Sequence, residues 1–259
     1  MLYLMHGLGN KFAIFDLRKN PDFAYQNYQF DYDYDQLIIL RASKNADLEM
    51  QILNKDGSCA DACGNATRCV ADIIYQTSGQ EAATIETVNR ILATKKIAEN
   101  YQVNMGQANF TWYDIPLAYE LDTLNLELLD TQKFGKAVAV NVGNPHLVFF
   151  VENIAEVNLA EEVAGLETAD LFPENININI AHIADAQNIK LETWERGAGA
   201  TAACGTGACA TAVAAYKKQL IELPVQITMP GGSLKIILNE NREILMTGGV
   251  KLEKSINLK

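Results

Sequence analysis

Two cysteines, Cys63 and Cys204, occupy matching positions, each between an alanine and a glycine just before a predicted helix. A thiol placed there lies among backbone N–H groups that lack a helical partner, at the positive end of the helix dipole. Thiols in such positions can have pKa values lowered from ~8.5 to between about 3.5 and 7.5, which makes them nucleophiles or general bases. The same N–H groups can bind a carboxylate, and Gly64 and Gly205 let a ligand approach the backbone closely.

The other three cysteines, Cys59, Cys69 and Cys209, lack this context, and we interpret them as small hydrophobic residues. The alternative interpretation counts the five cysteines as zinc ligands. Their spacings lack the paired CxxC arrangement of zinc sites, and the three histidines are scattered along the chain. We therefore predict no metal site.

Two further motifs point to alternative chemistries. His146 could activate a thiol, as in a hydrolase or transferase, although a single Cys–His pair leaves the second cysteine motif unexplained. Residues 197–202, GAGATA, formally fit the dinucleotide-binding pattern GxGxxA. That pattern is followed about 20 positions later by an acidic residue, where Lys217 and Lys218 stand in this chain.

The elements that position the two cysteines also occur twice. Alternating apolar residues predict strands at 48–54 and 189–195, each followed by a turn or glycine loop and then by the ACG triplet. Helices are predicted over 67–75 and 207–220, each followed by a strand, and residues 156–167 suggest a third helix. A unit repeated in the two halves predicts two α/β domains that face each other, with a boundary near Ile115-Pro116.

The composition excludes several classes of protein. In the 259 residues, 21 Lys and Arg stand against 32 Asp and Glu, and this net charge of −11 disfavours nucleic acid or an anionic membrane as partner. The uncharged run 197–216 has membrane-spanning length, but it consists mainly of Ala, Gly and Thr, which insert poorly. The N-terminus has no basic segment typical of a signal peptide, and we expect a cytoplasmic protein with no membrane association.

Along nearly its whole length the sequence resembles the diaminopimelate epimerases. The resemblance rests on nine motifs: HGLGN (6–10), DQ (35–36), LNKDGS (53–58), ACGNATRC (62–69), VNMG (103–106), NVGNPH (141–146), WERGAGAT (194–201), ACGTGACA (203–210) and PGG (230–232). It implies two pseudo-symmetric α/β (α+β) domains, each a strongly curved, mostly antiparallel sheet wrapped around a central helix, with the active site in the cleft between them. The domains would be 1–116, completed by the C-terminal strand 248–259, and 117–247.

The resemblance also implies a chemistry, the interconversion of LL- and meso-diaminopimelate for lysine and peptidoglycan synthesis without pyridoxal phosphate or any other cofactor. Cys63 and Cys204 would be the two acid–base thiols, acting on opposite faces of the α-carbon. His146 and Glu195 would support them. The positions that match substrate contacts of the family are Asn10, Gln36, Asn54, Gly64, Asn65, Asn144, Asn177, Glu195, Arg196, Gly205 and Thr206. The partner is then a small molecule, and the resemblance allows a homodimer.

Two alternatives stay open at this point. Related two-thiol racemases act on proline, hydroxyproline or histidine, and Ala200 stands where a glutamate is frequent in the epimerases. A non-catalytic protein that binds an amino acid or a metal could keep the same scaffold. The presence of both thiols disfavours the second alternative, because a binding protein needs no proton donor on each face of its ligand.

Overall fold

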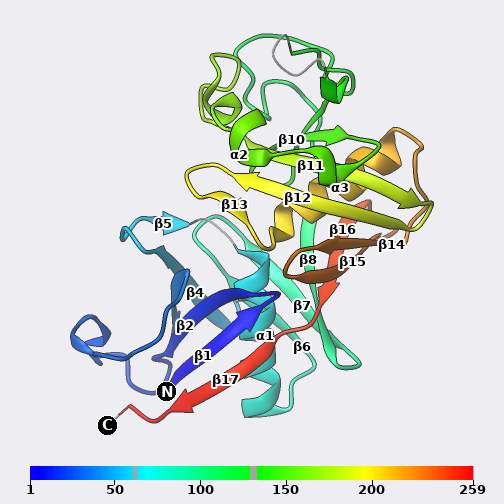
Figure 1. Cartoon of the computed structure of the whole chain (residues 1–259). Helices are drawn as coiled ribbons and strands as arrows, with labels where there is room; N and C mark the ends of the chain where they lie inside the picture. The colour runs from blue at the N-terminus through cyan, green and yellow to red at the C-terminus, as the bar shows by residue number, and fades with distance from the viewer. Residues whose placement is uncertain (61–62, 129–132, 259) are drawn as a thin grey trace. The chain divides into compact units, whose positions relative to one another are not determined.

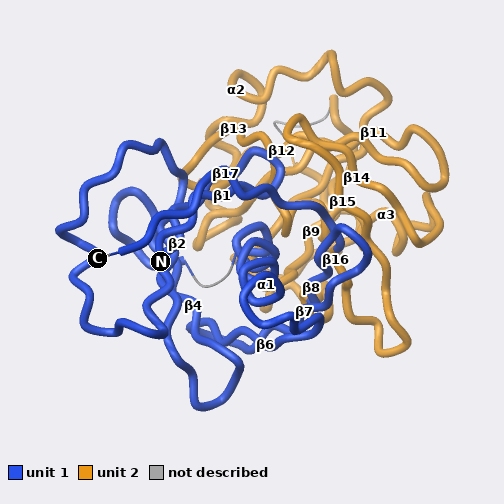
Figure 2. The backbone as a smooth tube through the Cα atoms, turned by 90° about the horizontal axis from the view of Figure 1, so that it is seen from below, with its two compact units in different colours: residues 1–104, 247–259 blue, residues 105–246 orange. Residues whose placement is uncertain are grey.

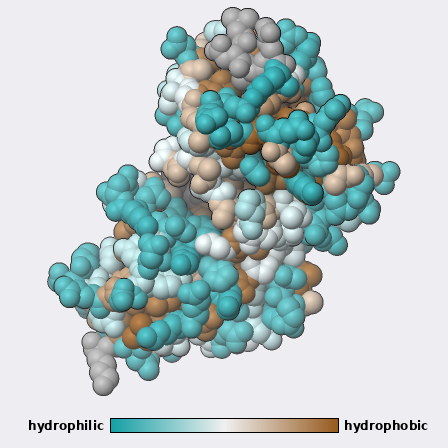
Figure 3. All heavy atoms as spheres, in the orientation of Figure 1, coloured by the Kyte–Doolittle hydropathy of each residue, from teal (hydrophilic) through white to brown (hydrophobic). Residues whose placement is uncertain are grey.

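The computed structural model describes residues 1–60, 63–128 and 133–258. The chain divides into two compact units, unit 1 with Met1–Asn104 and Thr247–Lys259 and unit 2 with Met105–Met246 (Figure 2). The boundary predicted near Ile115-Pro116 falls within unit 2, and the limits of the two catalytic domains stay a prediction. On the face shown in Figure 3, hydrophilic residues are interspersed with hydrophobic ones.

Unit 1 is a curved sheet with one central helix, α1 (Gly64–Ser78). Figure 2 shows the strands of this unit running around the helix. Strand β17 pairs antiparallel with β1, so that the C-terminal segment lies beside the N-terminal one (Figure 1). The strands are β1 (Leu2–Gly7), β2 (Asn10–Asp16), β3 (Gln36–Arg41), β4 (Leu48–Asn54), β5 (Cys59–Ala60), β6 (Ala82–Glu86), β7 (Ile91–Ile97), β8 (Asn100–Gln107, which continues into unit 2) and β17 (Lys251–Ile256).

Helix α1 is held in unit 1 by an apolar face with helical spacing. Its buried residues Ala66, Cys69, Val70, Ile73 and Ile74 follow the i, i+3, i+4, i+7, i+8 pattern and join the core formed with the sheet. Burial of each large aliphatic side chain contributes about 1.5–3 kcal/mol. This packing fixes where the helix begins and therefore where Cys63 lies.

Unit 2 is a second curved sheet around a second central helix, α3 (Gly205–Lys217). A short helix, α2 (Leu159–Glu162), and the 3-10 turns Ile154–Glu156 and Leu166–Thr168 lie at its periphery. A further 3-10 turn, Tyr25–Asn27, belongs to unit 1. The strands are β9 (Val138–Asn141), β10 (Pro145–Phe150), β11 (Asn177–Asp185), β12 (Asn188–Glu195), β13 (Gly199–Thr201), β14 (Val225–Met229), β15 (Gly232–Leu238) and β16 (Glu243–Gly248, which continues into unit 1).

Helix α3 is buried on nearly every side. Ten of its thirteen residues are buried, and it packs against six strands of its own unit. Its Ala and Gly residues leave room for the sheet to close around it. Among the residues that the structure describes, no helix is long and apolar enough to span a membrane, and the uncharged run 197–216 includes all of this core helix except Lys217.

The two units share one order of strand pairing. In unit 1, β2 pairs parallel with β3, β3 antiparallel with β4, and β4 parallel with β6. In unit 2, β10, β11, β12 and β14 repeat this order in the same orientations. Along the chain, the central helix α1 follows β5 in unit 1, and the central helix α3 follows β13 in unit 2. The predicted duplication and the mixed, mostly antiparallel fold class are therefore confirmed.

The predicted strands occur where the sequence placed them, and the turns at 56–57 and 230–232 join paired strands. The two central helices also occur, but with other ends: α1 is longer than the predicted 67–75, and α3 ends at Lys217, before the predicted end at Leu220. The third predicted helix, over 156–167, is wrong as a continuous element. The segment contains instead the short helix α2 between two 3-10 turns, and Gly165, with a φ of 89°, interrupts a right-handed helix.

We expect Gly79→Ala to destabilise unit 1 by about 1 kcal/mol, because Gly79 ends α1 with a φ of 73° that an alanine adopts only with strain. No atom crowds a Cβ at this position, so the cost is one of backbone conformation. Urea unfolding followed by circular dichroism measures it. The matched control is the reverse change, Ala98→Gly, at a residue with a φ of 50°. A Gly79→Ala protein as stable as the wild type, or an Ala98→Gly protein destabilised to the same degree, would contradict this explanation.

Candidate active site

Cys63 occupies the N-cap of α1 in unit 1. Its Sγ lies 3.9 Å from Oδ1 of Asn10, and the same oxygen accepts a 3.5 Å hydrogen bond from Nδ2 of Asn65. The thiol is half-buried, whereas Gly64 and Asn65 in the first turn of the helix are buried. The structure thus brings together Asn10, Cys63, Gly64 and Asn65, which the sequence had placed in one site.

Asp35 fixes the orientation of the Asn10 amide. Its Oδ2 accepts hydrogen bonds from Nδ2 of Asn10 at 2.9 Å and from the backbone N–H of Lys11 at 2.7 Å. Because a carboxylate only accepts, the amide nitrogen of Asn10 must face Asp35, and Oδ1 must face Cys63 and Asn65. Asp35 belongs to the DQ motif, but no role was predicted for it.

Gln36 and Asn54 form a second polar pair in unit 1. They are opposite each other in the β3–β4 register, and Nε2 of Gln36 donates to Oδ1 of Asn54 at 2.9 Å. Asn54 in turn donates to Oγ of Ser58 at 3.0 Å. Gln36 adjoins Asp35 in sequence, so the pair is connected through the backbone to the Asn10 and Cys63 cluster.

Cys204 occupies the N-cap of α3 in unit 2 and is buried. Its Sγ donates a hydrogen bond to Oε2 of Glu195 at 3.2 Å, lies 3.5 Å from Oγ1 of Thr206, and accepts the N–H of Gly207 at 3.4 Å. Thr201 holds the other oxygen of Glu195 through a 2.6 Å hydrogen bond from its hydroxyl. Thr201 ends the WERGAGAT motif but was not predicted to be a site residue.

The pKa of Cys204 is raised well above its ordinary value, opposite to the expected direction. Burial is the largest cause, and the negative charge of Glu195 adds to it. Hydrogen bonds from Thr206 and from the Gly207 N–H oppose the shift but are outweighed. In this state Cys204 is a thiol that donates to Glu195, so it is poised as a proton donor.

Asn177 connects the two polar loops of unit 2. Its Nδ2 donates to the carbonyl of Pro145 at 2.8 Å, and its Oδ1 accepts the backbone N–H of Arg196 at 3.2 Å. The side chain is 2% exposed. Asn177 thereby ties the NPH loop to the start of the ERG loop.

Arg196 is exposed, and one nitrogen of its guanidinium, Nη1, donates to the carbonyl of Glu174 at 2.9 Å. A guanidinium carries five N–H donors in a planar fork. The other N–H donors of the Arg196 guanidinium can therefore bind a carboxylate.

His146 is fully buried on β10, and both ring nitrogens have partners in unit 2. Burial lowers its pKa to about 3, with a further contribution from the positive charge of Arg196. His146 is therefore neutral at physiological pH, and neither ring nitrogen is left to activate a thiol. This geometry disfavours the Cys–His pair considered from the sequence.

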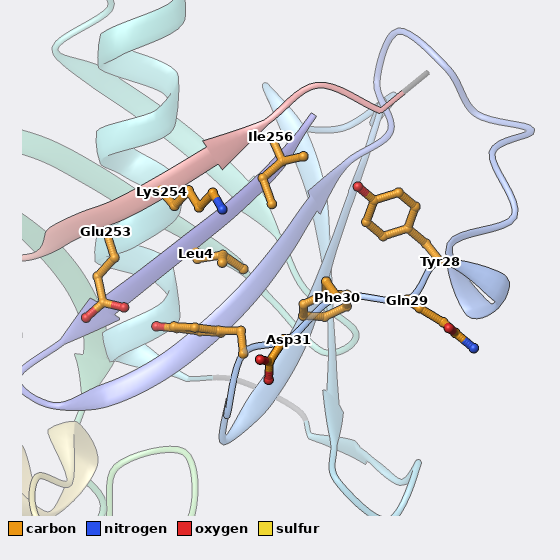
Figure 4. A pocket seen from close by; sticks show the side chains of 9 residues that line it. Leu4, Tyr28, Gln29, Phe30, Asp31, Glu253, Lys254 and Ile256 are labelled. Atoms are coloured by element: carbon orange, nitrogen blue, oxygen red, sulfur yellow. The ribbon is translucent and has the colours of Figure 1, made fainter.

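A concave region of unit 1 lies over β1 and β17 (Figure 4). Leu4 and Ile256 project from the strands, and Tyr28 and Phe30 lie beside them. None of the residues that line it was predicted to be part of the site. Within residues 1–60, 63–128 and 133–258, no group of three or more His, Cys, Asp or Glu side chains is arranged to hold a metal ion.

Comparison with known proteins connects this site to one family. Residues 2–111 and 138–253, which include both N-cap cysteines, match the family model described as diaminopimelate epimerase. The diaminopimelate epimerase of Rhizorhabdus wittichii is 43% identical over 252 residues, which cover 94% of this chain and 90% of that protein. The chain belongs to the diaminopimelate epimerase family. The diaminopimelate epimerase of Pelagibacter ubique, another relative, is 39% identical and is aligned over 99% of this chain and 98% of its own length.

Solved structures of lower sequence identity share the fold of the epimerase family. A phenazine biosynthesis protein of the PhzF family from Enterococcus faecalis superposes with a TM-score of 0.72 at 16% identity, over 98% of this chain and 96% of that one. A hydroxyproline epimerase from Agrobacterium vitis superposes with a TM-score of 0.64 at 12% identity, over 98% and 90% of the two chains. At these identities the comparison establishes the fold alone.

We expect the Cys204 thiol to stay protonated at pH 8, so that its alkylation by iodoacetamide continues to accelerate above pH 9, because the thiolate is the nucleophile. Glu195→Gln removes a charge that raises this pKa, and Cys204 should then react faster at pH 8 than in the wild type. Timed alkylation with peptide mass spectrometry measures both rates.

The exposed Cys59 serves as the internal reference for reagent concentration. Glu192→Gln, which removes a carboxylate from the same strand, is the control variant and should leave the rate at Cys204 unchanged. Slower alkylation in Glu195→Gln would mean that this carboxylate does not hold the proton on Cys204.

Proposed function

We propose that this chain interconverts LL- and meso-diaminopimelate by moving a proton at one α-carbon between two thiols, without a cofactor. The observation that carries the proposal is that each unit places a cysteine at the N-cap of its buried central helix, Cys63 on α1 and Cys204 on α3. Membership of the epimerase family supports the choice of substrate.

Two-base chemistry requires one thiolate and one thiol at the start of each turnover. Cys204 supplies the thiol, since burial and Glu195 keep its proton in place. Cys63 is then the thiolate that removes the α-proton, forming its S–H bond as the C–H bond breaks. Cys204 delivers its proton to the opposite face of the carbanion, and the charge states are exchanged when the reaction runs in reverse. Glu195, at 3.2 Å from Sγ, is placed to accept the Cys204 proton when this thiol must become the base.

The carbanion needs stabilisation that a cofactor would otherwise supply. As the proton leaves, negative charge develops on the substrate carboxylate, and donors placed there beforehand lower the barrier. We assign this role to the first-turn backbone N–H groups at Gly64, Asn65, Gly205 and Thr206, which lie at the N-termini of the two central helices, the positive ends of their dipoles. Removal of one such donor in comparable sites costs roughly 2.7–4 kcal/mol of transition-state stabilisation.

Polar groups outside the two thiols would bind the rest of the substrate. Arg196 offers its guanidinium fork to a carboxylate, and amides of both units offer donors and acceptors for an amino-acid group. The amides in question are Asn10, Gln36, Asn54, Asn144 and Asn177. Among them, Asn177 already uses both its Nδ2 and its Oδ1 in hydrogen bonds to the protein backbone.

We expect Cys63→Ala and Cys204→Ala each to lower epimerisation by at least 10²- to 10⁴-fold, the usual contribution of a general acid or base. The rate can be followed by NMR exchange of the α-proton and by chromatography of the two stereoisomers. Cys59→Ala and Cys69→Ala are the controls, because Cys59 is exposed on β5 and Cys69 lies in the core. Comparable losses in all four variants would point to a structural or metal-binding cysteine cluster and would exclude the two-thiol mechanism.

A second expectation concerns Arg196. Lysine keeps the charge but not the planar pair of donors, so Arg196→Lys should lose most of the contribution to substrate binding and raise the KM for diaminopimelate about 10-fold or more. Lys190→Arg, on β12, is the control for a change between the two cations and should be silent. An unchanged KM in Arg196→Lys would remove this residue from the substrate site.

A panel of amino acids separates the proposed substrate from those of other two-thiol racemases. Diaminopimelate should exchange its α-proton at a rate far above proline, hydroxyproline or histidine. Exchange of one of the latter at a comparable rate would change the substrate assignment and leave the thiol chemistry intact. The homodimer allowed by the resemblance stays a prediction, which light scattering of the purified protein would test.

A further inference from the structure

Three buried polar side chains form a connected series beneath the start of α3. Asn179 on β11 and His146 on β10 are 0% exposed, and Thr193 on β12 is 2% exposed. Asn179 contacts both others and also the backbone of β10. Neither Asn179 nor Thr193 was singled out in the sequence.

The carbonyl of Leu147 settles the orientation of the Asn179 amide. This carbonyl can only accept a hydrogen bond, and the Asn179 side-chain atom at 3.0 Å from it must therefore be Nδ2. Oδ1 then faces Thr193, whose hydroxyl donates to it at 3.2 Å. The second hydrogen of Nδ2 faces Nδ1 of His146 at 3.1 Å.

The amide in turn fixes the tautomer of His146. Because Nδ1 receives a hydrogen bond from Asn179, it carries no proton, and the proton of the neutral ring is on Nε2. Nε2 lies 3.0 Å from Oδ1 of Asn144 and donates to it. The positive charge of Arg196 further disfavours the doubly protonated form.

The hydrogen-bonded series ends at Asn144. With its Oδ1 bound to His146, its amide N–H₂ must point the other way, and no acceptor for this N–H₂ is found in the part of the chain that the structure describes. Asn144 is half-buried, in the loop before β10. The loop thus presents two N–H donors, not an oxygen, to whatever binds there.

Gly207 shows how closely this series is built against the active-site helix. A Cβ at Gly207 would lie 2.5 Å from Oδ1 of Asn179 and 3.1 Å from Oγ1 of Thr193. The same Cβ would lie 3.2 Å from Cβ of Cys204. Asn179 therefore packs directly behind the turn that carries the catalytic thiol.

We propose that Asn179 is a positioning residue that acts through His146 to hold the Asn144 amide with its N–H donors toward a carboxylate of the substrate. The inference rests on the proposed function for the identity of the ligand, a carboxylate of an amino acid. Reversal of the tautomer would make Asn144 donate to His146 and turn its oxygen toward the carboxylate. The attraction between the Asn144 amide and the carboxylate would be replaced by a repulsion. We then expect KM to rise about 10-fold to 100-fold, with a smaller change in kcat.

The first test needs the wild-type protein alone. With ¹⁵N-labelled histidine, long-range ¹H–¹⁵N correlation spectra distinguish the two neutral tautomers and the imidazolium ion. A His146→Gln sample identifies the His146 signals among those of the three histidines. We expect His146 to carry its proton on Nε2 from pH 5 to pH 9. A proton on Nδ1, or titration within this range, would overturn the proposal without any assay of activity.

The second test is Asn179→Asp, which replaces the donor facing Nδ1 with an acceptor of the same size. We expect the proton to move to Nδ1 and the KM for diaminopimelate to rise by the factor above. The exposed Asn241 provides the matched control, Asn241→Asp, which should keep the wild-type tautomer and KM.

The tautomer and the KM of Asn179→Asp each test a different step of the proposal. An unprotonated Nδ1 in Asn179→Asp would show that residue 179 does not set the tautomer, and a neutral ring protonated on Nδ1 with wild-type KM would show that the tautomer does not control binding. Either result overturns the proposal. If Asn179→Asp does not fold, the wild-type spectra still decide on the tautomer. A wild-type protein inactive on diaminopimelate would refute the proposed function, whereas the spectra test the hydrogen-bonded series independently.

Discussion

The structure depends on a single requirement, that a helix buried inside its own sheet must still satisfy the N–H groups of its first turn. These groups have no partner within the helix, and a surrounding sheet shields them from water. In unit 2 the thiol of Cys204 accepts one of them, from Gly207. The remaining donors at such a helix start favour a negatively charged ligand. A helix start of this kind, with a cysteine at its N-cap, occurs in both units.

The environment of Cys204 shows that position at a helix N-terminus does not by itself decide the charge of a thiol. The dipole and two hydrogen bonds favour the thiolate, but burial and the carboxylate of Glu195 favour the thiol and outweigh them. For a two-base reaction this is useful, because a pair of thiolates could not donate a proton. The carboxylate beside Cys204 favours the protonated thiol, the form that can donate a proton.

Patterns that act over short distances in the sequence predicted much of this structure. The helices predicted over 67–75 and 207–220, the strand alternation at 48–54 and 189–195, and the repeated ACG triplet indicated the two central helices, their strands and the position of each thiol. The sequence could not give the raised pKa of Cys204, because that depends on the depth of burial and on the hairpin that brings Glu195 back to the thiol. The hydrogen bonds made by both ring nitrogens of His146 could not be predicted for a similar reason. Its partner Asn179 belongs to a strand that comes much later in the chain, and only the parallel pairing of β10 and β11 makes them neighbours.

The central claim, that two different thiols handle the α-proton, is tested most directly by isotope incorporation during the first few per cent of conversion in D₂O. In a two-thiol reaction the removed proton stays on one sulfur, and the product receives its hydrogen from the other, which has equilibrated with solvent. We predict that the product is fully deuterated at the inverted α-carbon from the earliest time points. Mass spectrometry of LL- and meso-diaminopimelate gives this quantity. Product that retains the original α-protium in a substantial fraction of molecules would mean that one group both removes and returns the proton, and would contradict the account.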